Sequence, residues 1–133
     1  MSAERVTYVD SSALVKLAVR EPESQALRRH LVRRGSLACS ALARVEVARA
    51  LMSLGEHAIR RGDEVLSRID LVRINDRVLR AAAALMPAEL RSLDAIHLAT
   101  AQQFGGELHR IVTYDNRMAT AAETLGWRVE QPR

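Results

Sequence analysis

The alternation of short apolar runs with longer helix-like segments is the feature of this sequence that most restricts its fold. Runs with many β-branched residues predict strands over 5–9, 69–74 and 110–114, the short segment 36–39 is a candidate buried strand, and an edge strand is expected near 127–129. Segments with apolar residues at helical spacing predict helices over 13–18, 23–34, 41–54, 56–68, 76–85, 93–104 and 116–124. Because alternating strands and helices form β-α units, the sequence predicts an α/β fold built on a parallel sheet.

Capping signals and apolar faces refine these helices. Polar residues suited to helix N-caps are Ser11 or Ser12, Ser40, Asn75 or Asp76, and Ser92. The helix over 41–54 is expected to bury the face that carries Val45, Ala48, Leu51 and Met52. Gly62 is expected to interrupt the following helix, since glycine is a poor helix former.

Length and composition indicate one globular domain. The chain has 133 residues, 48% of them hydrophobic, which suits a single core, here residues 1–133. Cys39 is the only cysteine, so a disulfide-stapled fold is excluded. The sequence contains no segment typical of a signal peptide and no apolar run long enough to span a bilayer, so we expect a cytoplasmic protein.

The charge of the chain comes almost entirely from arginine. The formal net charge is +4, and Lys16 is the only lysine among 20 basic residues. Because the planar guanidinium group binds phosphate and carboxylate in a bidentate manner, nucleic acid and acidic protein are both plausible partners. Codon usage explains the same composition equally well, so composition alone leaves the partner open.

Four acidic residues occupy positions where a parallel sheet places its ligands. Asp10 and Asp115 each follow a predicted strand, and Glu46 and Asp94 fall in the first turns of predicted helices. Ligands of open α/β sheets bind at the carboxyl ends of the strands, where helices also begin. The four side chains can therefore meet in one crevice.

Carboxylates that lie close together repel one another unless cations or protons neutralise them. Hard divalent ions such as Mg²⁺ and Mn²⁺ prefer carboxylate and water ligands. The four histidines, at 30, 57, 97 and 109, form no pattern that would select zinc. A carboxylate-held Mg²⁺ or Mn²⁺ can activate water and stabilise charge on phosphate, so the pattern indicates phosphodiester chemistry.

Each acid taken alone also has a structural explanation. Asp10 can cap the helix that follows it, and Asp94 can interact with a helix dipole. Glu46 can pair with Arg49, three residues later in the same helix. Asp115 with Asn116 is typical of a turn. The functional interpretation therefore depends on the set of four.

Four segments together resemble the PIN-domain ribonucleases, and among them the VapC-type toxins of bacterial toxin–antitoxin pairs. The segments are 8–17 (YVDSSALVKL), 40–51 (SALARVEVARAL), 93–101 (LDAIHLATA) and 111–118 (IVTYDNRM). The four acids of that family match Asp10, Glu46, Asp94 and Asp115 in order and spacing, over nearly the whole chain. Relatives often have an aromatic residue where Met118 stands, a difference that removes no ligand.

The resemblance implies a PIN-like three-layer α/β/α sandwich with a central parallel sheet of four to five strands. It implies an endoribonuclease in which Asp10, Asp94 and Asp115 bind one or two Mg²⁺ or Mn²⁺ ions, and Glu46 holds a second ion or orients water. It places the hydroxyls of Ser11 and Thr113 beside this site, although helix capping and strand propensity explain them too. It also implies a homodimer and a cognate VapB-type antitoxin whose C-terminal segment covers the site.

The arginine-rich stretch on the second predicted helix is a candidate contact surface. It comprises Arg28, Arg29, His30, Arg33 and Arg34. It can bind RNA or the antitoxin, or it can be an ordinary solvated helix face.

Two other functions compete with the ribonuclease hypothesis. A receiver-type signalling domain also uses aspartates and Mg²⁺ on an α/β sheet, but it needs a lysine at a later strand end, and the only lysine here is Lys16 in the first predicted helix. A PIN-like module that binds a partner without catalysis is the other alternative, which the presence of all four acids disfavours.

Overall fold

The computed structural model describes residues 5–32 and 35–133, and within these it contains one sheet of five strands. The strands are β1 (Val6–Val9), β2 (Ser36–Ser40), β3 (Asp70–Val72), β4 (Leu108–Val112) and β5 (Val129–Glu130). The α-helices are α1 (Ser11–Ala18), α2 (Ser24–Leu31), α3 (Ala43–Leu51), α4 (Glu56–Leu66), α5 (Asp76–Ala84), α6 (Ser92–Gln102) and α7 (Asn116–Thr124). Short 3₁₀ turns follow α3 (Met52–Leu54) and α6 (Gly105–Glu107).

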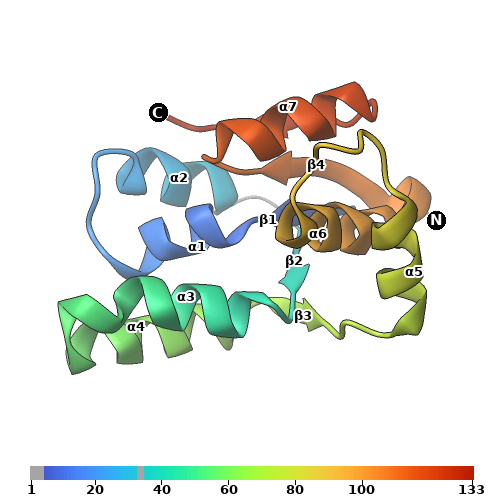
Figure 1. The fold of residues 1–133 in the computed structure, drawn as a ribbon. Helices are drawn as coiled ribbons and strands as arrows, with labels where there is room; N and C mark the ends of the chain where they lie inside the picture. The colour runs from blue at the N-terminus through green and yellow to red at the C-terminus, as the bar shows by residue number, and fades with distance from the viewer. Residues whose placement is uncertain (1–4, 33–34) are drawn as a thin grey trace.

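All neighbouring strands are parallel, in the order β3-β2-β1-β4-β5. The chain adds β2 and β3 on one side of β1 and then returns to add β4 and β5 on its other side (Figure 1). The strand order therefore reverses between β1 and β4. This reversal point is where open α/β sheets form a crevice at the carboxyl ends of their strands.

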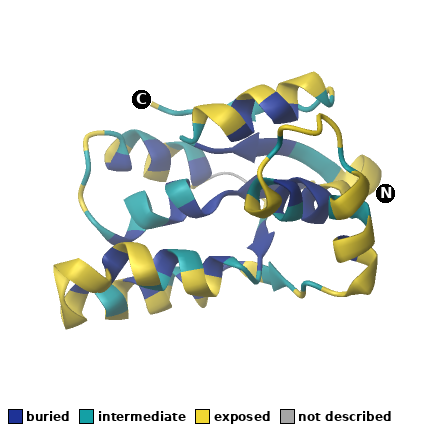
Figure 2. Cartoon of the chain, viewed as in Figure 1, coloured by how far each residue is buried: buried dark blue, intermediate teal, exposed yellow. Residues whose placement is uncertain are grey.

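The helices form two groups. Helices α1 to α4 pack on one another, whereas α6 packs against α5, α7 and strands β2 and β4. Right-handed crossovers place the two groups on opposite faces of the sheet, because the chain moves in opposite directions before and after β3. Strand β1, the carboxyl-terminal parts of β2 and β4 and the inward sides of the helices are buried, while the outer sides of the helices are exposed (Figure 2). The predicted parallel α/β/α sandwich is confirmed.

Every predicted strand and helix is present, with shifts of one to three residues at most ends and three corrected caps. Ser40 ends β2, and Leu42 takes the cap position of α3. The predicted helix over 23–34 is observed as α2, and Arg33 and Arg34 lie outside the described residues. Asn75 caps α5 as predicted, since its side chain accepts a hydrogen bond from the Val78 amide. Ser92 is instead the first residue of α6, behind Arg91 at the cap position. Ser11 and Ser12 lie inside α1, behind Asp10.

The buried face of α3 differs from the predicted one. Ala43, Val47 and Leu51 are buried at four-residue spacing, while Val45 and Met52 are 56% and 57% exposed. Val45 lies two residues from this stripe and so points to the far side of the helix. Met52 lies in the 3₁₀ turn, outside the α-helical repeat.

Gly62 does not interrupt α4, contrary to the prediction. A Cβ atom at this position would lie 2.6 Å from Leu51 Cδ1 and 3.3 Å from Val47 Cγ1 on α3. The absence of a side chain therefore permits the close approach of α3 and α4, and packing outweighs the low helix propensity of glycine.

Candidate active site

Asp10 lies at the reversal point of the sheet, directly after β1. Its backbone N–H donates to the carbonyl of Val112, at the end of β4, over 2.9 Å. Its side chain is only 5% exposed. A buried carboxylate is costly unless hydrogen-bond donors surround it, so Asp10 must have donors close by.

Two hydroxyl groups hold the Asp10 carboxylate. Ser12 Oγ and Thr113 Oγ1 each donate to Asp10 Oδ2 over 2.8 Å. Each hydroxyl also accepts a hydrogen bond from the backbone after β4: Ser12 from the Tyr114 N–H at 3.0 Å, and Thr113 from the Asp115 N–H at 3.1 Å. These bridges connect the end of β1 with the end of β4 and fix two of the four acids relative to each other.

Glu46 reaches the same region from the first turn of α3. Its Oε1 atom accepts a hydrogen bond of 2.8 Å from Ser11 Oγ on α1. The same oxygen lies 2.6 Å from His97 Nε2 on α6. His97 Nε2 also lies 3.7 Å from Asp10 Oδ1. His97 therefore lies between two of the predicted acids.

Asp94 and Asp115 complete the set from the starts of two helices. Asp94 is in the first turn of α6. Asp115 is the N-cap of α7, where its Oδ1 accepts hydrogen bonds from the amides of Arg117 and Met118. Both acids line a pocket of about 380 Å³, whose lining residues are Glu46, Arg91, Ser92, Leu93, Asp94, Asp115 and Arg117.

The acidic groups influence one another electrostatically. Partial burial raises the pKa of Asp94, and the negative charges of Asp115 and Asp10 raise it further. Its ionised form is therefore disfavoured in the folded chain. A bound cation would relieve this repulsion, as would a proton.

The pair formed by Glu46 and His97 has the opposite character. Burial raises the pKa of Glu46, but the hydrogen bond and charge of His97 and the hydrogen bond from Ser11 outweigh it, so the pKa is lowered overall. Burial lowers the pKa of His97, but its contacts with Cys39, Glu46 and Asp10 raise it to about 10. The two groups therefore form an ion pair at neutral pH.

The donor set suits a hard divalent cation. Carboxylates of Glu46, Asp94 and Asp115 line the pocket, and the Asp10 carboxylate is near enough to raise the pKa of Asp94. Such oxygens are the ligands that Mg²⁺ and Mn²⁺ prefer. Within residues 5–32 and 35–133, no group of three or more His, Cys, Asp or Glu side chains is arranged to hold an ion. Binding would thus require the mutually repelling carboxylates to draw together around the cation.

The structure brings all four predicted acids to one edge of the sheet, and their catalytic roles stay predictions. Thr113 contacts Asp10, and Ser11 contacts Glu46, as the resemblance implied. Sequence reasoning missed the parts played by Ser12, Tyr8 and His97. One signal was available, because His97 follows Asp94 by three residues and so shares its side of the helix.

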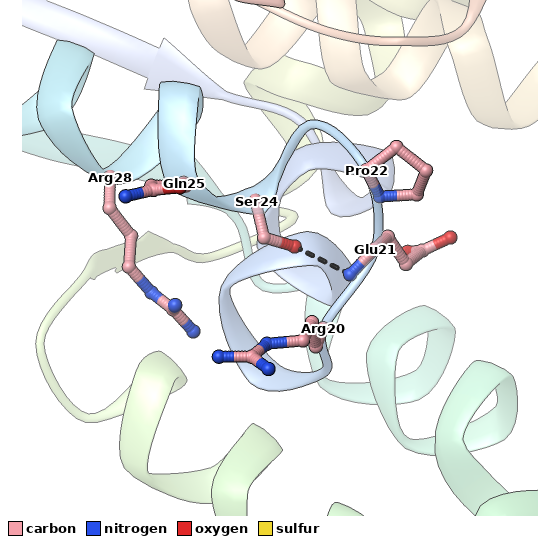
Figure 3. A pocket seen from close by; sticks show the side chains of 6 residues that line it. All are labelled: Arg20, Glu21, Pro22, Ser24, Gln25 and Arg28. Carbon is pink, nitrogen blue, oxygen red and sulfur yellow. Dashed lines mark hydrogen bonds between the residues drawn. The ribbon is translucent and has the colours of Figure 1, made fainter.

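A larger pocket, with a volume of about 670 Å³, is lined by the turn that connects α1 to α2 and by the first residues of α2. Figure 3 shows the side chains of Arg20 and Arg28 pointing toward each other. Among the residues that the structure describes, Glu21 is the one acid in its lining, so this pocket lacks the carboxylate set of the smaller one. Of the predicted arginine-rich stretch, Arg28 and Arg29 are exposed, whereas His30 pairs with Glu130 at 3.4 Å.

Comparison with known proteins identifies the family. The family model of the PIN domain matches residues 7–124. The chain is 58% identical over 125 residues to Ribonuclease VapC46 of Mycobacterium tuberculosis, covering 94% of this chain and 96% of that protein. It is 46% identical over 130 residues to Ribonuclease VapC35 of the same species, with the same coverage. The chain is a VapC-type PIN domain.

Solved structures agree with this PIN fold. VapC20 of M. tuberculosis, described as a toxin that cleaves the sarcin–ricin loop, superposes with a TM-score of 0.72 at 14% identity, covering 86% of this chain and 94% of that one. A toxin–antitoxin complex from Klebsiella pneumoniae superposes with a TM-score of 0.71 at 20% identity, covering 96% and 98%. In the described part of this PIN domain, no helix is long and apolar enough to cross a membrane.

Proposed function

We propose that this PIN domain is a metal-dependent endoribonuclease toxin that a cognate antitoxin inhibits. The observation that carries the proposal is the single pocket lined by Glu46, Asp94 and Asp115, with Arg91 and Arg117 beside them. Acidic groups suited to a cation thus adjoin basic groups suited to a phosphate backbone. The ribonuclease names of relatives at 58% and 46% identity support RNA as the substrate.

Asp10, Asp94 and Asp115 would hold Mg²⁺ or Mn²⁺, which supplies water activation and stabilisation of charge on the phosphate. Glu46 would hold a second ion or orient the attacking water, and the hydrogen bond from Ser11 and the contact with His97 would keep its carboxylate in place. Arg91 and Arg117 are exposed at the pocket and would bind the phosphates on either side of the cleaved bond. Ser12 and Thr113 keep the Asp10 carboxylate oriented.

Two protein partners belong to the proposal. The antitoxin's C-terminal segment would cover the acidic pocket, which is consistent with the similarity to a chain of the K. pneumoniae toxin–antitoxin complex. A homodimer would cover some of the exposed apolar side chains, such as Val45 next to Glu46 and Leu93 next to Asp94. Light scattering of the purified chain, with and without antitoxin, tests both partners.

The receiver alternative loses support because Lys16 is engaged elsewhere. Its amine forms a 2.9 Å contact with Glu23 and lies over the ring of Tyr114, 4.9 Å from its centroid. It also pairs with Glu21 at 3.7 Å. An amine held in this way does not contact a phosphoryl group on Asp10.

The test is cleavage of a cellular RNA pool by the purified, antitoxin-free chain in Mg²⁺, Mn²⁺ or EDTA. We expect cutting that requires metal and is lost in Asp94→Asn. Asp63→Asn, on the exposed side of α4, is the matched control and should cut like the wild type. RNA binding without cleavage in any metal would support the catalytically inactive binding module instead.

A further inference from the structure

A buried histidine lies directly beneath the acidic site. His97 is 1% exposed and sits one turn after Asp94 on α6, among the buried residues of that helix. A polar ring in such a place is stable only when both of its nitrogens find partners. Both do: Nδ1 lies 2.6 Å from the hydroxyl of Tyr8, and Nε2 lies 2.6 Å from Glu46 Oε1.

The Tyr8 side of this contact is rigid. Tyr8 is fully buried on β1, and its hydroxyl accepts a 3.0 Å hydrogen bond from the Ser40 backbone N–H on β2. Its ring meets the imidazole edge-on, with 6.0 Å between centroids and 80° between planes. Two strands of the sheet thereby determine how the His97 ring is turned.

The Glu46 side faces the pocket. A carboxylate only accepts hydrogen bonds, so Nε2 of His97 carries the proton and donates to Oε1 whether Nδ1 is protonated or not. Ser11 donates to the same oxygen, and no described residue forms a hydrogen bond with Oε2. The Glu46 side chain is 27% exposed and lines the pocket that also contains Asp94 and Asp115. The arrangement fixes one carboxylate oxygen and leaves the other for a ligand.

We propose that His97 is a positioning residue, which through its Nε2–H and its contact with Tyr8 holds Glu46 ready to bind a divalent cation or a water molecule at the site. This inference rests on the proposed ribonuclease function. A glutamate has three rotatable side-chain bonds, and fixing it before the substrate arrives avoids an entropic cost during the reaction. Because Nε2 also lies 3.7 Å from Asp10 Oδ1, the same ring sets the spacing of two acids.

If His97 only fills the core, any polar side chain of similar size can replace it. If it positions Glu46, the replacement must also donate a hydrogen bond to Glu46. Two amide substitutions distinguish these roles. In His97→Gln the amide nitrogen can take the place of Nε2 and still donate to Glu46. In His97→Asn the shorter amide reaches only the position of Nδ1, so the contact with Tyr8 is kept and the donor to Glu46 is lost. His57→Gln, on the exposed side of α4, is the control.

The three variants and the wild type are compared by thermal unfolding, by calorimetric titration with Mn²⁺, and by kcat and KM for RNA cleavage. We expect His97→Asn to lose roughly 10- to 100-fold in kcat or in Mn²⁺ affinity, the usual effect of removing a partner of a metal-site ligand, with an unchanged KM. His97→Gln, which keeps the donor to Glu46 but loses the contact with Tyr8, should lie between His97→Asn and the wild type in both, and His57→Gln should retain all of both.

Equal loss in His97→Asn and His97→Gln, or wild-type behaviour of both, would overturn the inference. If His97→Asn unfolds much more easily than His97→Gln, Tyr8→Phe decides, since it removes only the hydroxyl that orients the ring. A Tyr8→Phe protein with wild-type kcat and Mn²⁺ affinity would then refute the proposal. A wild-type chain that neither binds Mn²⁺ nor cuts RNA refutes the proposed function itself, which distinguishes the two failures.

Discussion

Replacing Thr113 by valine tests the hydroxyl that joins two of the acids. Thr113 is fully buried, donates to Asp10 Oδ2 and accepts from the Asp115 N–H. Valine has nearly the same shape, so the change removes these hydrogen bonds without creating a cavity. A hydrogen bond to a charged group contributes about 1.5–3 kcal/mol, and water cannot replace a donor at this depth.

We therefore expect Thr113→Val to lower the free energy of unfolding by about 2–3 kcal/mol, because the Asp115 amide also loses its acceptor. For a chain of 133 residues this corresponds to a decrease in melting temperature of roughly 7–11 °C. RNA cleavage should fall as well, since Asp10 would then be held by Ser12 alone.

Thr113→Ser is the matched control, because it keeps the hydroxyl and loses only a buried methyl group, at about 1 kcal/mol. The assay is urea unfolding followed by circular dichroism, with RNA cleavage measured on the same preparations. A Thr113→Val protein as stable as the wild type, or less affected than Thr113→Ser, would refute the reasoning that these hydrogen bonds fix Asp10.

Three further predictions concern stability and charge. Gly62→Ala should destabilise the chain by about 1–2 kcal/mol in urea unfolding, because the new Cβ collides with buried side chains of α3, whereas Gly106→Ala, with open space around it, should change little. Asp94→Asn should raise the free energy of unfolding of the metal-free chain at pH 7, since the raised pKa of Asp94 means that its ionised form destabilises the fold. This gain should vanish in acid, where the carboxyl group is protonated in both the folded and the unfolded state. A gain that persists in acid would contradict this cause. Asp115→Ala should cost about 1 kcal/mol by removing the cap of α7, while Asp115→Asn should keep the cap and melt like the wild type but lose RNA cleavage.

The order of strands and helices was predictable because it depends on local patterns. Strand β1 is a β-branched run, and α5 begins at an asparagine that caps it, so each signal lies within a few neighbouring residues. The placement of Asp10 and Asp115 beyond the ends of β1 and β4 followed from the same reading. Parallel pairing then brings the ends of neighbouring strands together at one edge.

The contacts that bind the site together were not predictable, because they join residues far apart in the chain. Thr113 meets Asp10 across 103 positions, and His97 meets Tyr8 across 89. Ser12 was predicted to cap α1, since its nearest backbone amides belong to that helix, but its hydroxyl turns to Asp10 and Tyr114 instead. Only packing decided which partner it met.

Local sequence patterns were enough to predict the α/β order, the parallel sheet and the edge at which the acids gather, because hydrophobic periodicity and turn chemistry act over a few neighbouring residues. Tertiary structure decided which face of α3 is buried, why Gly62 remains helical, and which donors hold each carboxylate. The physical reason is that burial removes water as a hydrogen-bond partner. A buried Asp10 or His97 must then take its partners from whichever strands and helices the fold places beside it.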